Sequence, residues 1–120
     1  MTDGDVRIKR VYETRATTDG FRVLVDRLWP RGLTHAEARL DDWLEDVGPS
    51  TPLRRWFGHD PARFAEFAER YRAELTTSEA FGQLKELVAE HPRVTLVYSA
   101  KDTEHNQAVV LRDLLEGREP

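Results

Sequence analysis

Apolar residues form three short runs along this 120-residue chain, and each run has the pattern of a strand. Val6 to Tyr12 alternates at first and is rich in residues that favour strands. Phe21 to Asp26 and Val94 to Tyr98 are nearly continuous apolar runs, which are typical of strands covered on both faces. The turn-forming residues Thr17 to Gly20 separate the first two runs. We therefore predict three strands, of which the last two are buried.

Shorter signals predict two short helices in the first half of the chain. Thr34 and Glu37 form a capping box, which marks the start of a helix. Thr51 can cap a second short helix that has Pro52 at its first position. Gly58 is then placed to end this helix.

Longer stretches of helical spacing predict three more helices. The apolar residues from Pro61 to Leu75 give the clearest pattern. Ser78 can cap the next helix, whose inner face ends at Val88, and a last helix has apolar positions from Ala108 to Leu115. The segment 40–47 fits helical spacing, but its class stays open. Strands that alternate with such helices indicate an α/β fold with a small, mainly parallel sheet flanked by helices in Rossmann-like layers.

Length and composition narrow the class of protein. A chain of this size suits one domain over residues 1–120. The net charge of -4 and the pI near 5.6 argue against nucleic acid as a partner. No apolar run reaches the roughly 20 residues of a membrane helix, and the acidic N-terminus is not a secretory signal. We therefore expect a cytoplasmic protein with no membrane partner.

The residue types also exclude several kinds of site. The chain has no cysteine, which excludes disulfides, thiol nucleophiles and thiolate metal sites. Its histidines lack metal-ligand spacing, and glycine-rich phosphate loops and nucleophile elbows are absent. We expect no metal and no cofactor. A small anionic molecule and a second copy of the chain remain as partners to consider.

Polar residues gather directly after the two buried strands. Ligands of open α/β sheets bind beyond the carboxyl ends of the strands, so the two loops would form one site if the strands are close and parallel. The candidate site residues are Asp26, Arg27 and Arg31 after the first buried strand, and Ser99, Lys101, His105 and Asn106 after the second.

These candidates have the chemistry of an anion site. Arg27, Arg31 and Lys101 can hold an anion. Free backbone N–H groups near residues 103–105 would add the positive end of the last helix. Ser99 and Asn106 complete the predicted set of ligand-binding residues.

Two of the candidates could carry catalysis. Asp26 could orient Arg27 or act as a base, and His105 could transfer protons because histidine titrates near neutrality. Structural interpretations compete with these roles, since an Asp-Arg pair after a strand is commonly an ion pair and Asp102 can cap the last helix. Trp43 and Trp56 lie beside apolar residues at helical spacing, so we expect both to be mostly buried. A second polar cluster around Trp56 consists of Arg54, Arg55 and His59.

Two functions are consistent with this pattern. The first is an anion-binding cleft at the strand C-termini of a small protein, which would suit an enzyme that acts on a phosphorylated or carboxylated small molecule. The alternative is a non-catalytic module that binds a metabolite or a protein and keeps its arginines in structural pairs with carboxylates. An open cleft lined by arginine favours the first, and arginines buried against carboxylates favour the second. The sequence does not decide whether the protein is an enzyme.

Two motifs of the chain are specific. Residues 25–32 read Val-Asp-Arg-Leu-Trp-Pro-Arg-Gly, and residues 98–102 read Tyr-Ser-Ala-Lys-Asp, with Asn106 following. Over nearly its whole length the chain resembles the YeaO-like family of uncharacterised bacterial proteins, a domain of unknown function termed DUF488. The resemblance implies a small cytoplasmic α/β domain, favours a short strand or extended segment within 40–47, and implies no reaction. The chain departs from the family pattern at Gln107, where that pattern leads us to expect His.

Overall fold

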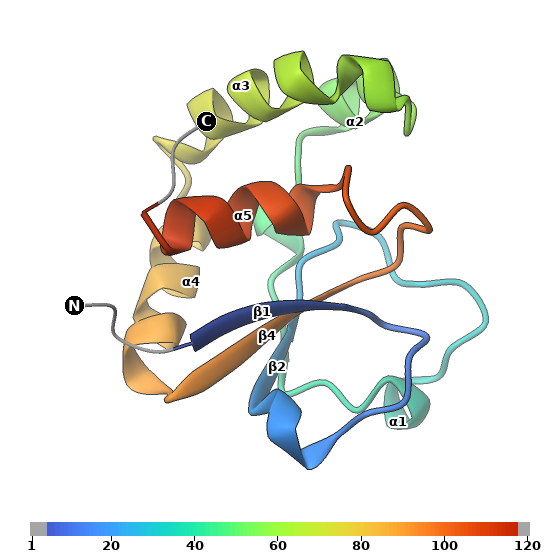
Figure 1. Cartoon of the computed structure of the whole chain (residues 1–120), viewed down its shortest axis with the longest axis vertical. Coiled ribbons are helices and arrows are strands. Elements are labelled where there is room, and N and C mark those ends of the chain that lie inside the picture. The colour runs from blue at the N-terminus through green and yellow to red at the C-terminus, as the bar shows by residue number, and fades with distance from the viewer. Residues whose placement is uncertain (1–4, 118–120) are drawn as a thin grey trace.

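A parallel sheet of four strands forms the centre of residues 5–117, the part of the chain that the computed structural model describes (Figure 1). The strands lie in the order β1-β4-β2-β3, and each neighbouring pair is parallel. The predicted α/β class with a parallel sheet is therefore confirmed. The strands are β1 (Asp5–Arg10), β2 (Phe21–Leu24), β3 (Asp42–Trp43) and β4 (Arg93–Tyr98).

Five α-helices accompany the strands within this range, and none is long and apolar enough to cross a membrane. The capping box of Thr34 and Glu37 and the cap at Ser78 are confirmed. The predicted cap at Thr51 is wrong, because Ser50 is the cap and its hydroxyl accepts the N–H of Leu53 at 3.3 Å. The helices are α1 (His35–Ala38), α2 (Thr51–Phe57), α3 (Phe64–Leu75), α4 (Glu79–Glu90) and α5 (Gln107–Leu115).

The two faces of the sheet are covered very differently. Because side chains alternate along a strand, Val23 and Leu96 lie in a larger core, whereas Leu24 and Val97 lie in a smaller one. Helices α2, α3, α4 and α5 pack against the larger core. The smaller core is covered by α1 and by the loop segments around it. Strands β2 and β4 are thus buried on both faces, as their apolar runs predict.

A buried charge cluster completes the face that α1 covers. Arg22 is only 1% exposed, and its guanidinium donates to Asp19 at 2.7 Å. It also donates to the carbonyl oxygens of Ala38 and Arg39, both at 2.9 Å. Lys9 contacts the same carboxylate at 3.2 Å. Since a buried charge needs such partners, the cluster fixes α1 and the 3-10 turn at 17–19 onto the sheet.

The segment 40–47 does not form an α-helix, and the two tryptophans Trp43 and Trp56 lie at the borders of the cores. The segment contains the two residues of β3 and then a 3-10 turn at 45–47. Trp43 and Trp56 each pack against one of the two cores and keep only a minor part of their surface exposed, so both are mostly buried, as expected, although neither is fully buried. Trp56 lies at the edge of its helix face, beneath the guanidinium groups of Arg63 and Arg70 at 5.5 and 4.5 Å.

The chain leaves the neighbouring strands β2 and β4 toward opposite faces of the sheet. The pairing of the two strands extends to Val25, whose N–H donates to the Val97 carbonyl at 3.0 Å. From this edge, β2 leads to α1 over the smaller core, and β4 leads to α5 over the larger core. Such a switch point is where open α/β sheets bind ligands. The two candidate loops therefore begin at one edge.

Candidate functional site

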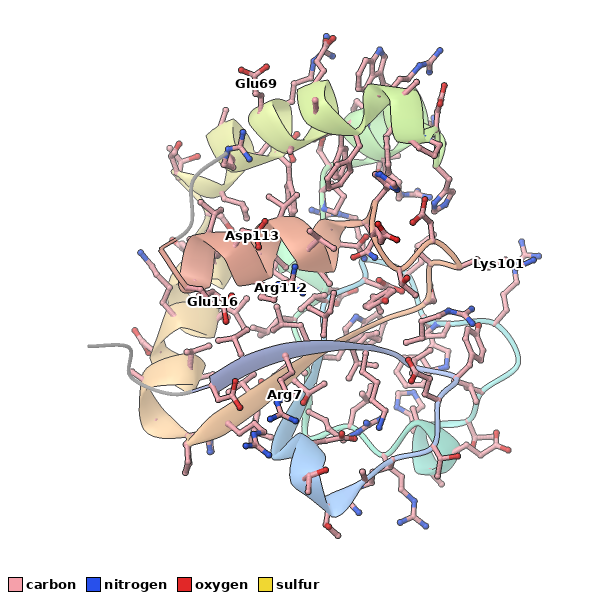
Figure 2. All side chains as sticks on the ribbon, viewed as in Figure 1. Arg7, Glu69, Lys101, Arg112, Asp113 and Glu116 are labelled. Carbon is pink, nitrogen blue, oxygen red and sulfur yellow. The ribbon has the colours of Figure 1, made fainter. Side chains whose placement is uncertain are left out.

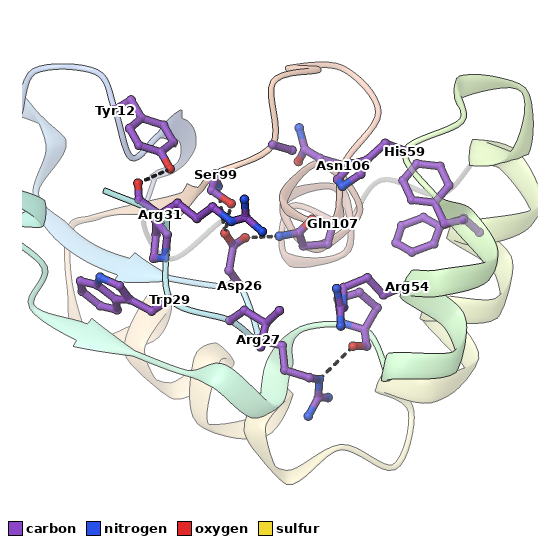
Figure 3. Close-up of a pocket in the computed structure, with 16 residues that line it drawn as sticks. Tyr12, Asp26, Arg27, Trp29, Arg31, Arg54, His59, Ser99, Asn106 and Gln107 are labelled. Carbon is purple, nitrogen blue, oxygen red and sulfur yellow. Dashed lines mark hydrogen bonds between the residues drawn. The ribbon is translucent and has the colours of Figure 1, made fainter. Parts of the chain in front are cut away.

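A cavity of about 390 Å³ opens at the C-terminal edge of β2 and β4 (Figure 3). Sixteen residues line it, and they come mainly from the loops after these strands, from α2 and its end, and from the start of α5. Five of the seven predicted site residues are among them: Asp26, Arg27, Arg31, Ser99 and Asn106. Lys101 and His105 are not.

Asp26 is a buried carboxylate on the wall of this cavity. One of its oxygens accepts the backbone N–H of Ser99 at 3.0 Å and the Ser99 hydroxyl. The other oxygen accepts the side-chain amide of Gln107. Burial raises the pKa of the Asp26 carboxyl above its ordinary value, although the hydrogen bonds from Ser99 and Gln107 oppose the shift. Asp26 thus connects β2, β4 and α5 and favours its protonated form more than a solvated carboxyl would.

Arg27 is occupied by the protein itself. Its Nε donates to the carbonyl oxygen of Pro49 at 2.9 Å, and its Nη2 donates to that of Gly48 at 2.8 Å. Its Nη1 lies 3.6 Å from the exposed carboxylate of Asp46. The backbone at Gly48 is close enough to the β2 loop that an added Cβ would lie 3.0 Å from the backbone nitrogen of Arg27. Arg27 therefore fixes the segment that leads into α2, and it pairs with Asp46 and these carbonyls, not with Asp26.

Arg31 differs from Arg27 although the same loop carries both residues. Its side chain lines the cavity, and among residues 5–117 the guanidinium has no hydrogen-bond or ion-pair partner. Its backbone is nevertheless held, because the Tyr12 hydroxyl donates to the Arg31 carbonyl at 2.9 Å. Figure 3 shows the side chain directed toward the Asp26–Gln107 pair.

Arg54 also lies on the cavity wall, and its guanidinium is the second one there without a partner among the described residues. Its Nε is buried and has no hydrogen-bond partner, and the described residues provide no ion pair for its guanidinium. In the view of Figure 3, Arg54 and Arg31 lie on either side of the Asp26–Gln107 pair. A buried polar group without a partner is uncommon and calls for an explanation. Arg54 is thus a candidate site residue that belonged to a separate cluster in the sequence.

His59 also enters the cavity wall from the end of α2. It follows Gly58, and both residues have positive φ, 54° for the glycine and 58° for the histidine. A non-glycine residue in this region is uncommon and often marks a functional turn. The charge interaction with His59 lowers the pKa of the Asp26 carboxyl, which places the two groups within electrostatic range.

Ser99, Asn106 and Gln107 give the cavity its polar support. The hydroxyl of Ser99 donates to Asp26, as described. Asn106 is 1% exposed and caps α5, because its Oδ1 accepts the N–H of Val109 at 3.2 Å while its Nδ2 donates to the Asp102 carbonyl at 2.8 Å. Both polar atoms of the Asn106 side chain are therefore used by the fold. The predicted helix cap at Asp102 is therefore wrong, since Asn106 has that position.

Lys101, Asp102 and His105 lie together outside the cavity lining. Lys101 is exposed, and Figure 2 shows its side chain pointing away from the body of the protein. The Asp102 carboxylate accepts the N–H groups of Glu104 and His105 and contacts the His105 ring at 2.9 Å. Residues 103–105 thus precede α5, and the expected free N–H groups at this helix start are partly occupied by Asp102. The His105 ring packs edge-on against Phe64.

The electrostatic balance of the cavity is positive, because one buried carboxylate faces three arginines in its lining. Trp29, which also lines it, donates its indole N–H to the Leu33 carbonyl at 2.7 Å and stacks on His35. No group of three or more His, Cys, Asp or Glu residues suited to a metal ion occurs within residues 5–117. The arrangement can therefore attract an anion through its arginines.

Known proteins match nearly the whole chain. The sequence model of a family described as the "Inactive DUF488-N3 subclade" matches residues 5–119. The chain belongs to the YeaO-like DUF488 family. It is 43% identical over 111 residues to the uncharacterized protein YeaO of Escherichia coli (strain K12), which covers 92% of this chain and 96% of YeaO. It is 45% identical over 113 residues to the uncharacterized protein Rv3073c of Mycobacterium tuberculosis, with 94% and 95% covered. No solved structure matches this DUF488 chain.

Proposed function

We propose that this DUF488 protein binds a small anionic molecule with a phosphate or carboxylate group in the cavity between the β2 and β4 loops. We further propose that binding, without turnover, is its function. The acid group would lie between Arg31 and Arg54, next to the Asp26–Gln107 pair. Both arginines belong to the cavity lining, which is the usual position of ligands in this type of sheet.

The unpartnered guanidinium of Arg54 carries the proposal. Its buried Nε lacks an acceptor, and desolvating a charged donor without compensation is unfavourable. An anion in the cavity would pair with this guanidinium and offset its charge, because the Arg54 side chain belongs to the cavity lining. The free guanidinium of Arg31 supports the same conclusion, because arginine offers a planar set of donors that matches a carboxylate or phosphate.

Binding without turnover is supported by the contacts of Asp26 and by the family description. Two donor residues already occupy both oxygens of this carboxylate, which limits its use as a base. The matching family is described as inactive. The second candidate function is an enzyme in which Asp26 transfers a proton, and the raised pKa of this carboxyl in a cavity favours it.

Phosphate binding to matched arginine variants tests the proposal. Arg31→Gln and Arg54→Gln should each weaken the binding of inorganic phosphate by about tenfold or more, because each removes a charge-assisted hydrogen bond. The matched control is Arg55→Gln, since Arg55 is the next residue of α2 but is exposed and lies outside the cavity lining. Calorimetric titration at fixed ionic strength measures the affinities, and thermal unfolding without phosphate checks the fold of each variant.

Equal losses in all three variants would mean that phosphate responds only to net charge, and this would overturn the proposal. Absence of phosphate and acetate binding to the unmodified protein would overturn it as well. Conversion of a bound anion by the unmodified protein, abolished in Asp26→Asn, would favour the enzymatic candidate.

A further inference from the structure

The exposed part of the cavity lining carries two large apolar side chains beside Arg31 and His59. Leu28 and Tyr12 are the two large hydrophobic side chains of residues 5–117 that are clearly exposed, at 59% and 44%. Both line the cavity. A single exposed hydrophobic residue needs no explanation, but two at the mouth of one cavity are a local feature that points to a ligand.

Leu28 and Tyr12 differ in how firmly the fold holds their side chains. Leu28 packs against neither of the two hydrophobic cores, although it stands between Arg27 and Trp29, whose side chains are held by the protein. The Tyr12 ring is held in place, because its hydroxyl donates to the Arg31 carbonyl and the Arg10 guanidinium lies 5.0 Å from the ring centre. The fold therefore fixes an apolar ring beside a cationic residue.

The cavity is also larger than an inorganic anion requires. Its volume of about 390 Å³ falls within the roughly 300–1,000 Å³ that is common for small-molecule sites. Half of its sixteen lining residues are aromatic, aliphatic or proline. Phe57 and Phe67 close one wall as a stacked pair with ring centres 4.3 Å apart. A free phosphate or carboxylate ion would leave this apolar lining unused.

We propose that the ligand is an amphipathic acid, in which one phosphate or carboxylate group is joined to an aromatic or aliphatic body. This inference rests on the proposed anion site, and it names the class of ligand. The acid group lies between Arg31 and Arg54, and the apolar body lies against Leu28 and Tyr12 at the mouth. Burial of the body then adds affinity that an inorganic anion does not have.

Pairs of probes that differ only in the apolar body test this inference. Phenyl phosphate should bind at least about tenfold more tightly than inorganic phosphate, and benzoate should exceed acetate by a similar factor. Leu28→Ser should reduce this advantage severalfold and leave the affinity for inorganic phosphate unchanged. The variant removes a side chain with no core contact, so its unfolding temperature should match that of the unmodified protein.

The outcomes separate the two proposals. If inorganic phosphate binds through Arg31 and Arg54 but phenyl phosphate has no advantage, the amphipathic ligand is excluded and the anion site remains. If no probe binds, both proposals fail. An advantage that Leu28→Ser leaves intact would overturn the inference, because the body would then lie elsewhere. Self-association that Leu28→Ser abolishes would also overturn it, since a second copy would then cover the mouth of the cavity.

Discussion

The loops after β2 and β4 carry similar numbers of charged residues but direct them differently. After β2, Arg27 donates to backbone carbonyls, while Arg31 lines the cavity and its guanidinium has no partner within residues 5–117. After β4, the Asp102 and His105 side chains contact each other, and Lys101 points into solvent. The β2 loop thus supplies cationic charge to the cavity, whereas the β4 loop supplies hydrogen bonds from Ser99 that hold Asp26.

This difference shows which charged residues are informative about a ligand. Arg27 and Arg31 are four positions apart and look equivalent in the sequence. Their partners distinguish them, because a guanidinium that the protein already satisfies has a structural role, whereas an unpartnered one at a cavity is available to an anion. The same criterion selects Arg54, which is distant from both loops in the sequence.

The largest effect should come from removing Arg27. Arg27→Ala should lower the free energy of unfolding by about 2–4 kcal/mol, because the carbonyl oxygens of the buried residues Gly48 and Pro49 lose charged donors. Urea denaturation measures the change. Arg31→Ala is the matched control in the same loop and should change stability by no more than about 0.5 kcal/mol. Equal losses in the two variants would erase the distinction between these arginines.

Asp26 should give a smaller, pH-dependent effect at the point where the two loops meet. Burial raises the pKa of this carboxyl in the folded protein above its ordinary value of 3.8. Between these two values the folded state keeps a proton that the unfolded chain has lost, so stability falls as pH rises through this window. Asp26→Asn removes that fall. The stability of the variant relative to the unmodified protein should therefore increase with pH across the window and then level off.

Ser99 provides a way to sharpen this measurement. Its hydroxyl favours the charged form of Asp26, so Ser99→Ala should raise the pKa of the carboxyl further and extend the fall of stability to higher pH. Denaturant unfolding at a series of pH values records both variants. A stability difference for Asp26→Asn that stays flat with pH would show that the buried carboxyl is not shifted.

Much of the fold follows from the local pattern of the chain. The apolar runs place β2 and β4, and the cap at Ser78 and the capping box at Thr34 place two helix starts. These features depend on neighbouring residues, so the sequence contains them. The sequence around β3 is ambiguous, because its two residues form a strand only through pairing with β2, a contact between distant positions.

The candidate site is predictable only in part, for the same reason. The position at the ends of β2 and β4 follows from the fold class. The direction of each side chain does not, because it depends on partners that the sequence leaves unplaced, such as the carbonyls that bind Arg27. Arg54 and Gln107 reach Asp26's side of the cavity from α2 and α5. Their sequence separation from the β2 loop gives no signal of this proximity.

The smallest effect is expected for Lys101, and it tests the comparison of the two loops directly. Lys101 follows a buried strand as Arg27 does, and the sequence pattern makes it a predicted anion ligand. Its exposed side chain points away from the protein and does not line the cavity. Lys101→Ala should therefore leave the phosphate affinity unchanged within about twofold, since a distant exposed charge is largely screened by salt. It should also change stability by no more than about 0.5 kcal/mol.

Titration of Lys101→Ala and Arg54→Gln with inorganic phosphate at fixed ionic strength compares the two losses of affinity. A loss of affinity in Lys101→Ala as large as that in Arg54→Gln would mean that the β4 loop turns toward the cavity when an anion binds. The charged residues of the two loops would then act on the same ligand, and the contrast between them would hold only without an anion.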